Sequence, residues 1–304
     1  MTKCCVRVPA TSANLGPGFD CLGVALGLYH ELRVEEEEGE GVEIEAFGDG
    51  AEVVPRDESN RIYQGMACVF ARTGYRPGRL YLQSRNEIPL ARGLGSSAAA
   101  YAAGLAAGVV LSGGELDQRE IIELGVAAEG HPDNIVPAVL GGFTVTAVGE
   151  AGLAYTRLEL PVGLRVVVAV PDFELSTAAA RKVLPQEVSF SQAVANQARV
   201  GLLVAALATG RLDLLRTAME DGLHQPSRAE LVPGMDEVMR AALDAGALGA
   251  ALSGAGPTML ACVEDEGDAV GKAMELAWEK KGIAAESRIL QVDDVGLQVE
   301  RNER

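Results

Sequence analysis

The sequence of 304 residues predicts an α+β fold divided into two domains. Its length exceeds that of one average domain and suits two modest ones. Apolar residues recur with a period of two in some segments and near four in others, which indicates strands mixed with helices. Neither an internal repeat nor a low-complexity linker interrupts this pattern. We place the boundary near 155–162, which gives domains of residues 1–158 and 159–304.

The first domain is expected to be rich in strands. Alternation of Val42 and Ile44 with Glu43 and Glu45 predicts a strand with one polar face, and the acidic run before it, 35–38, suits a solvated hairpin turn. The other predicted elements are strands at 1–8 and 31–35, helices at 60–73 and 97–111, a helix from Asp117 capped through Glu120, and strands at 141–148 and 153–159.

The second domain opens on the β-branched run 164–170, which ends at Pro171 and suits a buried strand. A helix is expected to start at Ser189, because Gln192 completes a capping box. The glycine turn 254–257 joins two further strands and is a place where the backbone can approach a ligand. The remaining predictions are helices at 211–221, 235–245 and 267–281, and strands at 247–253 and 258–263.

Composition excludes several classes of protein. Hydrophobic residues make up 48% of the chain, but the longest apolar stretch, 98–111, is too short to cross a bilayer. Five cysteines without Cys-x-x-Cys spacing and only three histidines argue against a disulfide framework and a structural zinc site. A net charge of −17 disfavours nucleic acid or an anionic membrane as a partner. The N-terminus has no signal-peptide pattern, so a cytoplasmic location is expected.

The most informative segment ends a strand-like stretch and opens a helix of small residues. Gly93 and Gly95 favour positive φ, while Ser96 and Ser97 supply hydroxyls at a helix start that attracts anions. The segment resembles neither a Walker loop nor a Rossmann fingerprint. Because it carries no lysine, Arg92, the helix N-terminus and a metal ion are expected to neutralise a bound phosphate. The alternative is a flexible connector capped by serine.

Three separated segments carry a family resemblance: Pro9–Asp20, the glycine-serine loop, and Leu252–Thr258. Together they resemble the motifs of the galactokinase, homoserine kinase, mevalonate kinase and phosphomevalonate kinase superfamily. Within it, Thr11–Asp20 and Glu129–Asn134 are similar to the homoserine kinase family. The resemblance implies an N-terminal domain like domain 2 of ribosomal protein S5, a C-terminal ferredoxin-like domain, an active site between them, and a homodimer.

The resemblance also implies how ATP and Mg²⁺ are bound. Asn60 is expected near the adenine and Ser97 on the metal. A carboxylate should complete the metal site; Glu123 and Glu129 are the candidates, and we favour Glu129 because it adjoins Gly130–Asn134. The expected phosphate-binding residues are Pro89, Leu90, Ala91, Arg92, Gly93, Leu94, Gly95, Ser96, Ser97, Ala98 and Ala99.

For the second substrate the family pattern implies an amino-acid pocket. A carboxylate such as Asp20 suits its ammonium group, and an arginine suits its carboxylate. The residues that match the pattern are Asn14, Asp20, His131, Asp133, Arg181 and Arg228. The expected activity is ATP-dependent phosphorylation of the side-chain hydroxyl of L-homoserine to O-phospho-L-homoserine, in threonine biosynthesis. The alternatives are a related kinase for another alcohol or sugar, and a non-catalytic nucleotide-binding regulator.

Catalysis is expected to rest on positioning and charge neutralisation during in-line transfer. The resemblance implies that Asn134 occupies the position of the base, and an amide cannot take the hydroxyl proton; Asp133 beside it is an alternative base. The residues expected to act on the transferred group are Ser97, Glu129, Asn134, Thr177 and Arg181.

Overall fold

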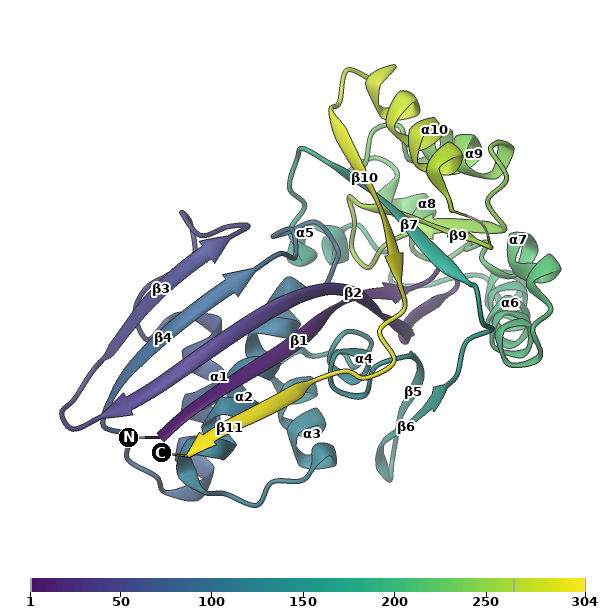
Figure 1. Ribbon diagram of the computed structural model, residues 1–304. Helices are drawn as coiled ribbons and strands as arrows, with labels where there is room; N and C mark the ends of the chain where they lie inside the picture. Colours follow the sequence, from purple (N-terminus) through teal and green to yellow (C-terminus); the bar gives the residue numbers. More distant parts are fainter. Residues whose placement is uncertain (1, 265, 304) are drawn as a thin grey trace.

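The computed structural model describes residues 2–264 and 266–303 and contains two sheets (Figure 1). The larger sheet runs in the order β11-β1-β2-β4-β3, and β5 joins it through β2 and pairs with β6. Among the described strands of this sheet, β3 and β4 are parallel and the other pairs are antiparallel. Its strands are β1 (Thr2–Asn14), β2 (Gly18–Glu37), β3 (Val42–Gly48), β4 (Arg79–Asn86), β5 (Phe143–Gly149), β6 (Gly152–Leu158) and β11 (Gln298–Glu303).

Helices pack against one face of this sheet: α1 (Arg61–Thr73), α2 (Ser96–Ser112), α3 (Gln118–Glu129) and α4 (Ile135–Leu140). The alanine- and glycine-rich α2 is buried along nearly its whole length. Small residues let it approach α1 closely, since a Cβ on Gly104 would lie 2.0 Å from the carbonyl oxygen of Ile62. This packing holds α2, whose first turn includes the buried Ala98 and Ala99, firmly in the core.

The smaller sheet has the order β10-β7-β9-β8, with antiparallel pairs. Its strands are β7 (Arg165–Pro171), β8 (Gly249–Leu252), β9 (Met259–Val263) and β10 (Ala285–Gln291). Helices α9 (Met235–Asp244) and α10 (Asp268–Glu279) provide the βαββαβ connections of a ferredoxin-like unit. The predicted α+β class with two kinds of domain is confirmed.

The connection from β7 to β8 is long and mostly helical. It contains α5 (Thr177–Lys182), α6 (Phe190–Thr209), the 3₁₀ turn η1 (Leu212–Leu214), α7 (Leu215–Ala218) and α8 (Gln225–Arg228). The predicted capping boxes are confirmed, at Ser189 with Gln192 and at Asp117 with Glu120.

The predicted helix 211–221 is wrong in its length. The chain forms η1 and α7 there and then turns, because the Asp221 carboxylate accepts bonds from the backbone N–H groups of Leu223, His224 and Gln225. Five elements were not predicted: α4, α5, α8, β10 and β11. Each spans only four to seven residues, too few for a clear periodicity.

The predicted boundary at 158/159 falls between β6 and β7, which lie in different sheets. The chain then returns to its starting sheet, because β11 pairs with β1 over Thr2–Arg7. We therefore propose that the first structural unit includes residues 298–303 as well as residues up to 158.

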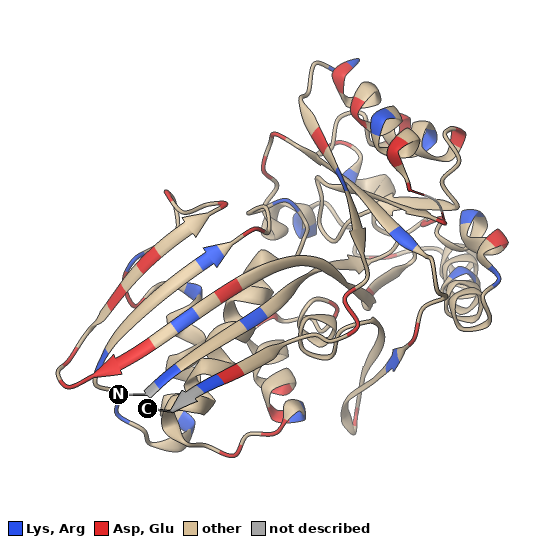
Figure 2. Cartoon of the chain, viewed as in Figure 1, with Lys and Arg blue, Asp and Glu red and all other residues tan. Residues whose placement is uncertain are grey.

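None of the helices in the described part of the chain is both long and apolar enough to cross a membrane. Acidic residues lie toward the end of β2 and on the edge strand β3 of the larger sheet (Figure 2). All five cysteines are free thiols. Burial raises the pKa of the Cys262 thiol to about 12.

Candidate active site

A cavity of about 550 Å³ lies between the larger sheet with its helices and the loops and short helices that contribute residues 175–181, 228 and 254–255. Its walls come from the β1–β2 turn, the segment between β3 and α1, the loop before α2, the end of α3, and α5. Residues predicted from three distant parts of the sequence, among them Asn14, Ser97 and Arg228, line this one cavity.

The glycine-serine loop has the backbone that the sequence predicts. Gly93 has a φ of +77° and Gly95 a φ of +71°, and Gly95 rather than a serine is the N-cap of α2. No side chain caps this helix start, so the N–H groups of its first turn are available to an anion. Ser96 is buried and accepts a bond from Asn86 Nδ2 (3.2 Å), which leaves Ser97 as the exposed hydroxyl.

The two glycines allow close contact with the rest of the protein. A Cβ on Gly93 would lie 2.2 Å from the Ser253 carbonyl oxygen, and one on Gly95 would lie 2.0 Å from Thr11 Oγ1. The Ser253 hydroxyl donates to the Gly93 carbonyl at 2.7 Å. The second glycine turn, 254–257, thus lies against the first, and it approaches the loop backbone.

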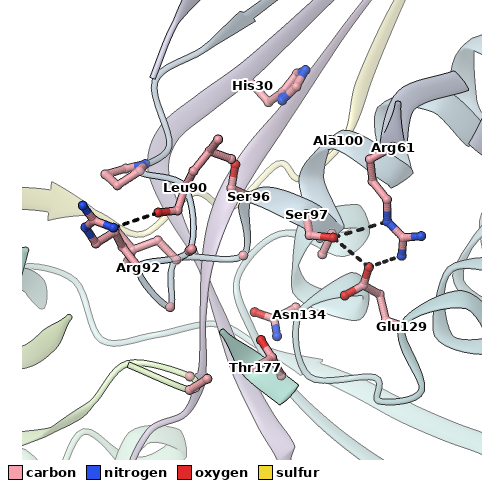
Figure 3. Close-up of a pocket in the computed structure, with 18 of the residues that line it drawn as sticks. His30, Arg61, Leu90, Arg92, Ser96, Ser97, Ala100, Glu129, Asn134 and Thr177 are labelled. Atoms are coloured by element: carbon pink, nitrogen blue, oxygen red, sulfur yellow. Dashed lines mark hydrogen bonds and ion pairs between the residues drawn. The ribbon is translucent and has the colours of Figure 1, made fainter. Parts of the chain in front are cut away.

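The predicted metal ligands lie side by side. Ser97 Oγ donates to Glu129 Oε1 at 3.2 Å, and the Glu129 side chain is only 12% exposed (Figure 3). The alternative, Glu123, is 48% exposed and pairs with Arg119 on the surface of α3. Hydroxyl and carboxylate oxygens are ligands that Mg²⁺ accepts, so Ser97 and Glu129 fit this ion.

The cation beside these oxygens is not the one that the sequence suggests. Arg92 donates to the carbonyls of Pro171 and Leu90, so its guanidinium is turned away from Ser97 (Figure 3). Arg61 takes this place: it contacts Glu129 Oε1 and donates to Ser97 Oγ at 3.3 Å. It was missed, although it follows Asn60 directly.

Asn60 also lines the cavity, and its side chain is hydrogen-bonded within the protein. It accepts from the Ile62 N–H at 2.9 Å as the N-cap of α1 and donates to the Pro55 carbonyl at 2.6 Å. His30, another cavity residue that was missed, contacts Ser84 Oγ through Nε2. Burial lowers the pKa of His30 to about 4, so it is neutral at physiological pH.

The part of the cavity in which the sequence predicts an amino-acid pocket contains two charge pairs. Arg181 donates to both carboxylate oxygens of Asp20, at 3.0 and 2.7 Å. His131 Nδ1 lies 2.5 Å from Asp133 Oδ1. Burial acts to lower the pKa of His131, but the hydrogen bond and charge of Asp133 outweigh it, and this pKa is raised.

Arg228 is a buried charge, only 2% exposed. It donates through Nη1 to the Gly254 carbonyl (2.9 Å) and through Nε to the Ala180 carbonyl (3.3 Å). Burial, with the like charge of Arg181 beside it, lowers the pKa of Arg228 to about 10. An anion in the cavity would relieve this cost.

The remaining predicted residues lie between the two halves. Asn14 is buried, donates to the Gly254 carbonyl (2.9 Å) and accepts from the Asp20 N–H (3.0 Å), so it holds the motifs together. Asn134 Oδ1 accepts from Thr11 Oγ1 at 2.9 Å. Thr177 is exposed at the start of α5 and faces Asn134 (Figure 3).

Comparison with known proteins agrees with this architecture. The model of the GHMP kinases N terminal domain matches residues 60–142, and that of the GHMP kinases C terminal domain matches residues 203–282. Homoserine kinase of Moorella thermoacetica is 49% identical over 91% of this chain and 93% of its own length. That of Carboxydothermus hydrogenoformans is 48% identical over 93% and 92%.

Solved structures give the same result. Homoserine kinase from Cytophaga hutchinsonii superposes with a TM-score of 0.89 at 31% identity, over 98% of this chain and 97% of its own. Mevalonate kinase of L. major superposes with a TM-score of 0.72 at 17% identity, over 92% and 94%, and shares the fold. The chain belongs to the homoserine kinase family of the GHMP kinases.

Proposed function

We propose that this chain transfers the γ-phosphoryl group of ATP to the side-chain hydroxyl of L-homoserine. One observation carries the proposal: a single cavity joins an anion-binding helix start at Ser97 to a pocket that holds Asp20, Arg181 and Arg228. The first half suits a nucleotide phosphate, and the second suits an ammonium and a carboxylate on one small molecule. The family membership supports the same reaction.

The residues at the two ends of the cavity have different proposed roles. Asp20 and Arg181 form an ion pair with each other; a zwitterion can pair with both, with its ammonium on Asp20 and its carboxylate on Arg181 and Arg228. This orientation would direct the side-chain hydroxyl toward Asn134 and the loop. The N–H groups of α2 and the Ser97 hydroxyl would then stabilise the transferred phosphoryl group.

We propose Ser97 and Glu129 as the residues that hold Mg²⁺, which when bound supplies positive charge for the phosphate oxygens. Asn134 orients the substrate hydroxyl and takes no proton, because its amide is not basic. As the new O–P bond forms and ADP leaves, the hydroxyl proton passes to an oxygen of the transferred phosphoryl group. The Asp133 carboxylate is buried against His131 and serves to position it. Transfer without a strong general base accords with a loose phosphoryl transition state.

The experiment is an ADP-release assay with L-homoserine, combined with ³¹P NMR of the product. We expect ADP release only with Mg²⁺ present and a phosphomonoester signal on homoserine. Release with a sugar or another alcohol, and not with homoserine, would favour a related kinase. ATP binding without ADP release from any amino alcohol would favour a non-catalytic regulator.

Glu129 and Glu123 can be separated by matched substitutions on the same helix. Glu129→Gln is expected to raise the Mg²⁺ concentration needed for half-maximal activity by tenfold or more, of the order reported for changes around metal ligands. Glu123→Gln is the control, because its exposed carboxylate pairs with Arg119. The opposite pattern would make Glu123 the ligand.

The resemblance further supports a homodimer in the cytoplasm as the working form. Sedimentation velocity at several protein concentrations tests the dimer. A single species of 31.7 kDa at all concentrations would contradict it. Fractionation of cells that express the chain tests the location, and recovery in the membrane pellet would contradict it.

A further inference from the structure

The glycine-serine loop, residues 89–99, directs no cationic side chain of its own toward a bound phosphate. The segment 89–99 contains no lysine, and its arginine, Arg92, is directed to the carbonyls of Pro171 and Leu90. Phosphate sites normally pair the anion with a cationic side chain as well as a helix start. The guanidinium that lies beside Ser97 comes from the first residue of α1, Arg61.

Arg61 is held in place by contacts of several kinds. Its Nε donates to Ser97 Oγ at 3.3 Å, its Nη2 contacts Glu129 Oε1, and its Nη1 donates to Gln64 Oε1 at 3.2 Å. Its guanidinium carbon lies 4.3 Å from the centre of the Tyr101 ring. The side chain is 31% exposed, so it can change partners without leaving a charge buried.

Arg61 therefore contacts the same two oxygens that fit the metal ion. A guanidinium and a divalent cation weaken each other's binding to Glu129 Oε1, because the two positive charges repel each other at contact distance. A nucleotide changes this balance, since its phosphates give the guanidinium a new anionic partner at the neighbouring helix start.

We propose that Arg61 is a further positioning residue of the reaction: it competes with free divalent metal for Glu129 and Ser97, and it moves onto the nucleotide phosphates when metal and nucleotide bind together. Arg61 thereby couples metal binding to nucleotide binding. This inference rests on the proposed function, because it takes the ligand to be a nucleoside triphosphate with its metal.

The test measures two binding reactions that do not require turnover. Mn²⁺ is titrated into the nucleotide-free protein and followed by electron paramagnetic resonance, and ATP is titrated in EDTA by calorimetry. In Arg61→Met, Mn²⁺ should bind about fivefold more tightly, because a competing cation is gone. ATP in EDTA should bind about tenfold more weakly, because a charge-assisted contact is lost.

The opposite signs of the two shifts distinguish this role from a structural one. A variant that was merely misfolded would lose both affinities, and thermal unfolding of each variant checks the fold. Arg61→Lys should keep Mn²⁺ affinity near that of the wild type, since the charge remains. Arg119→Met is the matched control, because Arg119 pairs with Glu123 on the same helix as Glu129, and both of its curves should match the wild type.

Weaker binding of both ligands by Arg61→Met, or curves identical to the wild type, would overturn the proposal. These outcomes are separable from failure of the proposed function. If the wild-type chain binds ATP and Mn²⁺ but does not phosphorylate homoserine, the function is refuted while the Arg61 comparison still decides the competition.

Discussion

Arg228 offers the sharpest test of how the pocket selects its substrate. Burial, together with the like charge of Arg181, lowers its pKa to about 10, well below the usual range of an arginine. At about 1.4 kcal/mol for each pKa unit, holding this charge in the site costs on the order of 3 kcal/mol. A substrate carboxylate that pairs with this guanidinium recovers part of that cost. Among the described residues, no protein group accepts a hydrogen bond from its Nη2, so the two N–H groups of this nitrogen remain for the substrate.

We expect Arg228→Met to raise the KM for L-homoserine by about ten- to one-hundredfold, since a hydrogen bond to a charged group is worth about 1.5–3 kcal/mol. The KM for ATP should not change. The free energy of unfolding should change by less than about 2 kcal/mol, because removal of a buried charge offsets the lost donors to two carbonyls. Urea denaturation measures this second quantity.

A substrate comparison isolates the carboxylate. 3-Aminopropan-1-ol is homoserine without its carboxylate, so Arg228→Met should lower kcat/KM for homoserine much more than for the aminoalcohol. Arg216→Met, in the exposed part of α7, is the control and should leave both values unchanged. An equal loss for both substrates would refute the assignment of Arg228 to the carboxylate, as would an unchanged KM for homoserine.

Four further predictions follow from the site. Ser97→Ala should lower kcat and raise the Mg²⁺ requirement in an activity titration; an unchanged kcat would remove Ser97 from the metal site. Asp133→Asn should keep the acidic limb of the pH–kcat profile, because this residue is not expected to act as the base, and loss of that limb would show that it is. His131→Gln should lower the free energy of unfolding most below pH 6.5, and the difference should shrink as pH rises through the raised pKa of His131; a difference in urea denaturation that does not vary with pH would contradict the ion pair. Gly93→Ala should destabilise the protein by about 2 kcal/mol or more, because a Cβ there would lie 2.2 Å from the Ser253 carbonyl oxygen and φ is positive; a melting temperature equal to that of the wild type would refute this.

The sequence was most informative where local chemistry determines structure. The helix start at Ser96, the positive φ of Gly93 and Gly95, and the capping box at Ser189 all depend on neighbours within a few residues. The family resemblance also predicted that the three separated motifs, Pro9–Asp20, the glycine-serine loop and Leu252–Thr258, belong to one site.

Individual side-chain contacts between residues far apart in the sequence could not be predicted from the sequence pattern. Arg61 and Glu129 are separated by 68 positions and Arg181 and Asp20 by 161, and no periodicity reports such pairs. The direction of an arginine side chain could not be predicted for the same reason. Arg92 belongs to the loop, but it donates to the carbonyl of Pro171, 79 positions away. The chain's last strand was missed because its pairing with β1 is visible only in the folded sheet.

That pairing has a consequence for folding of the protein. Because β11 covers one edge of β1 from Thr2 to Arg7, this edge completes its hydrogen bonds only when a segment more than 290 positions further along the chain folds onto it. Until then the outer edge of β1 offers unpaired N–H and C=O groups, a known template for association between chains. Association between partly folded chains is therefore expected at this edge until β11 pairs with it.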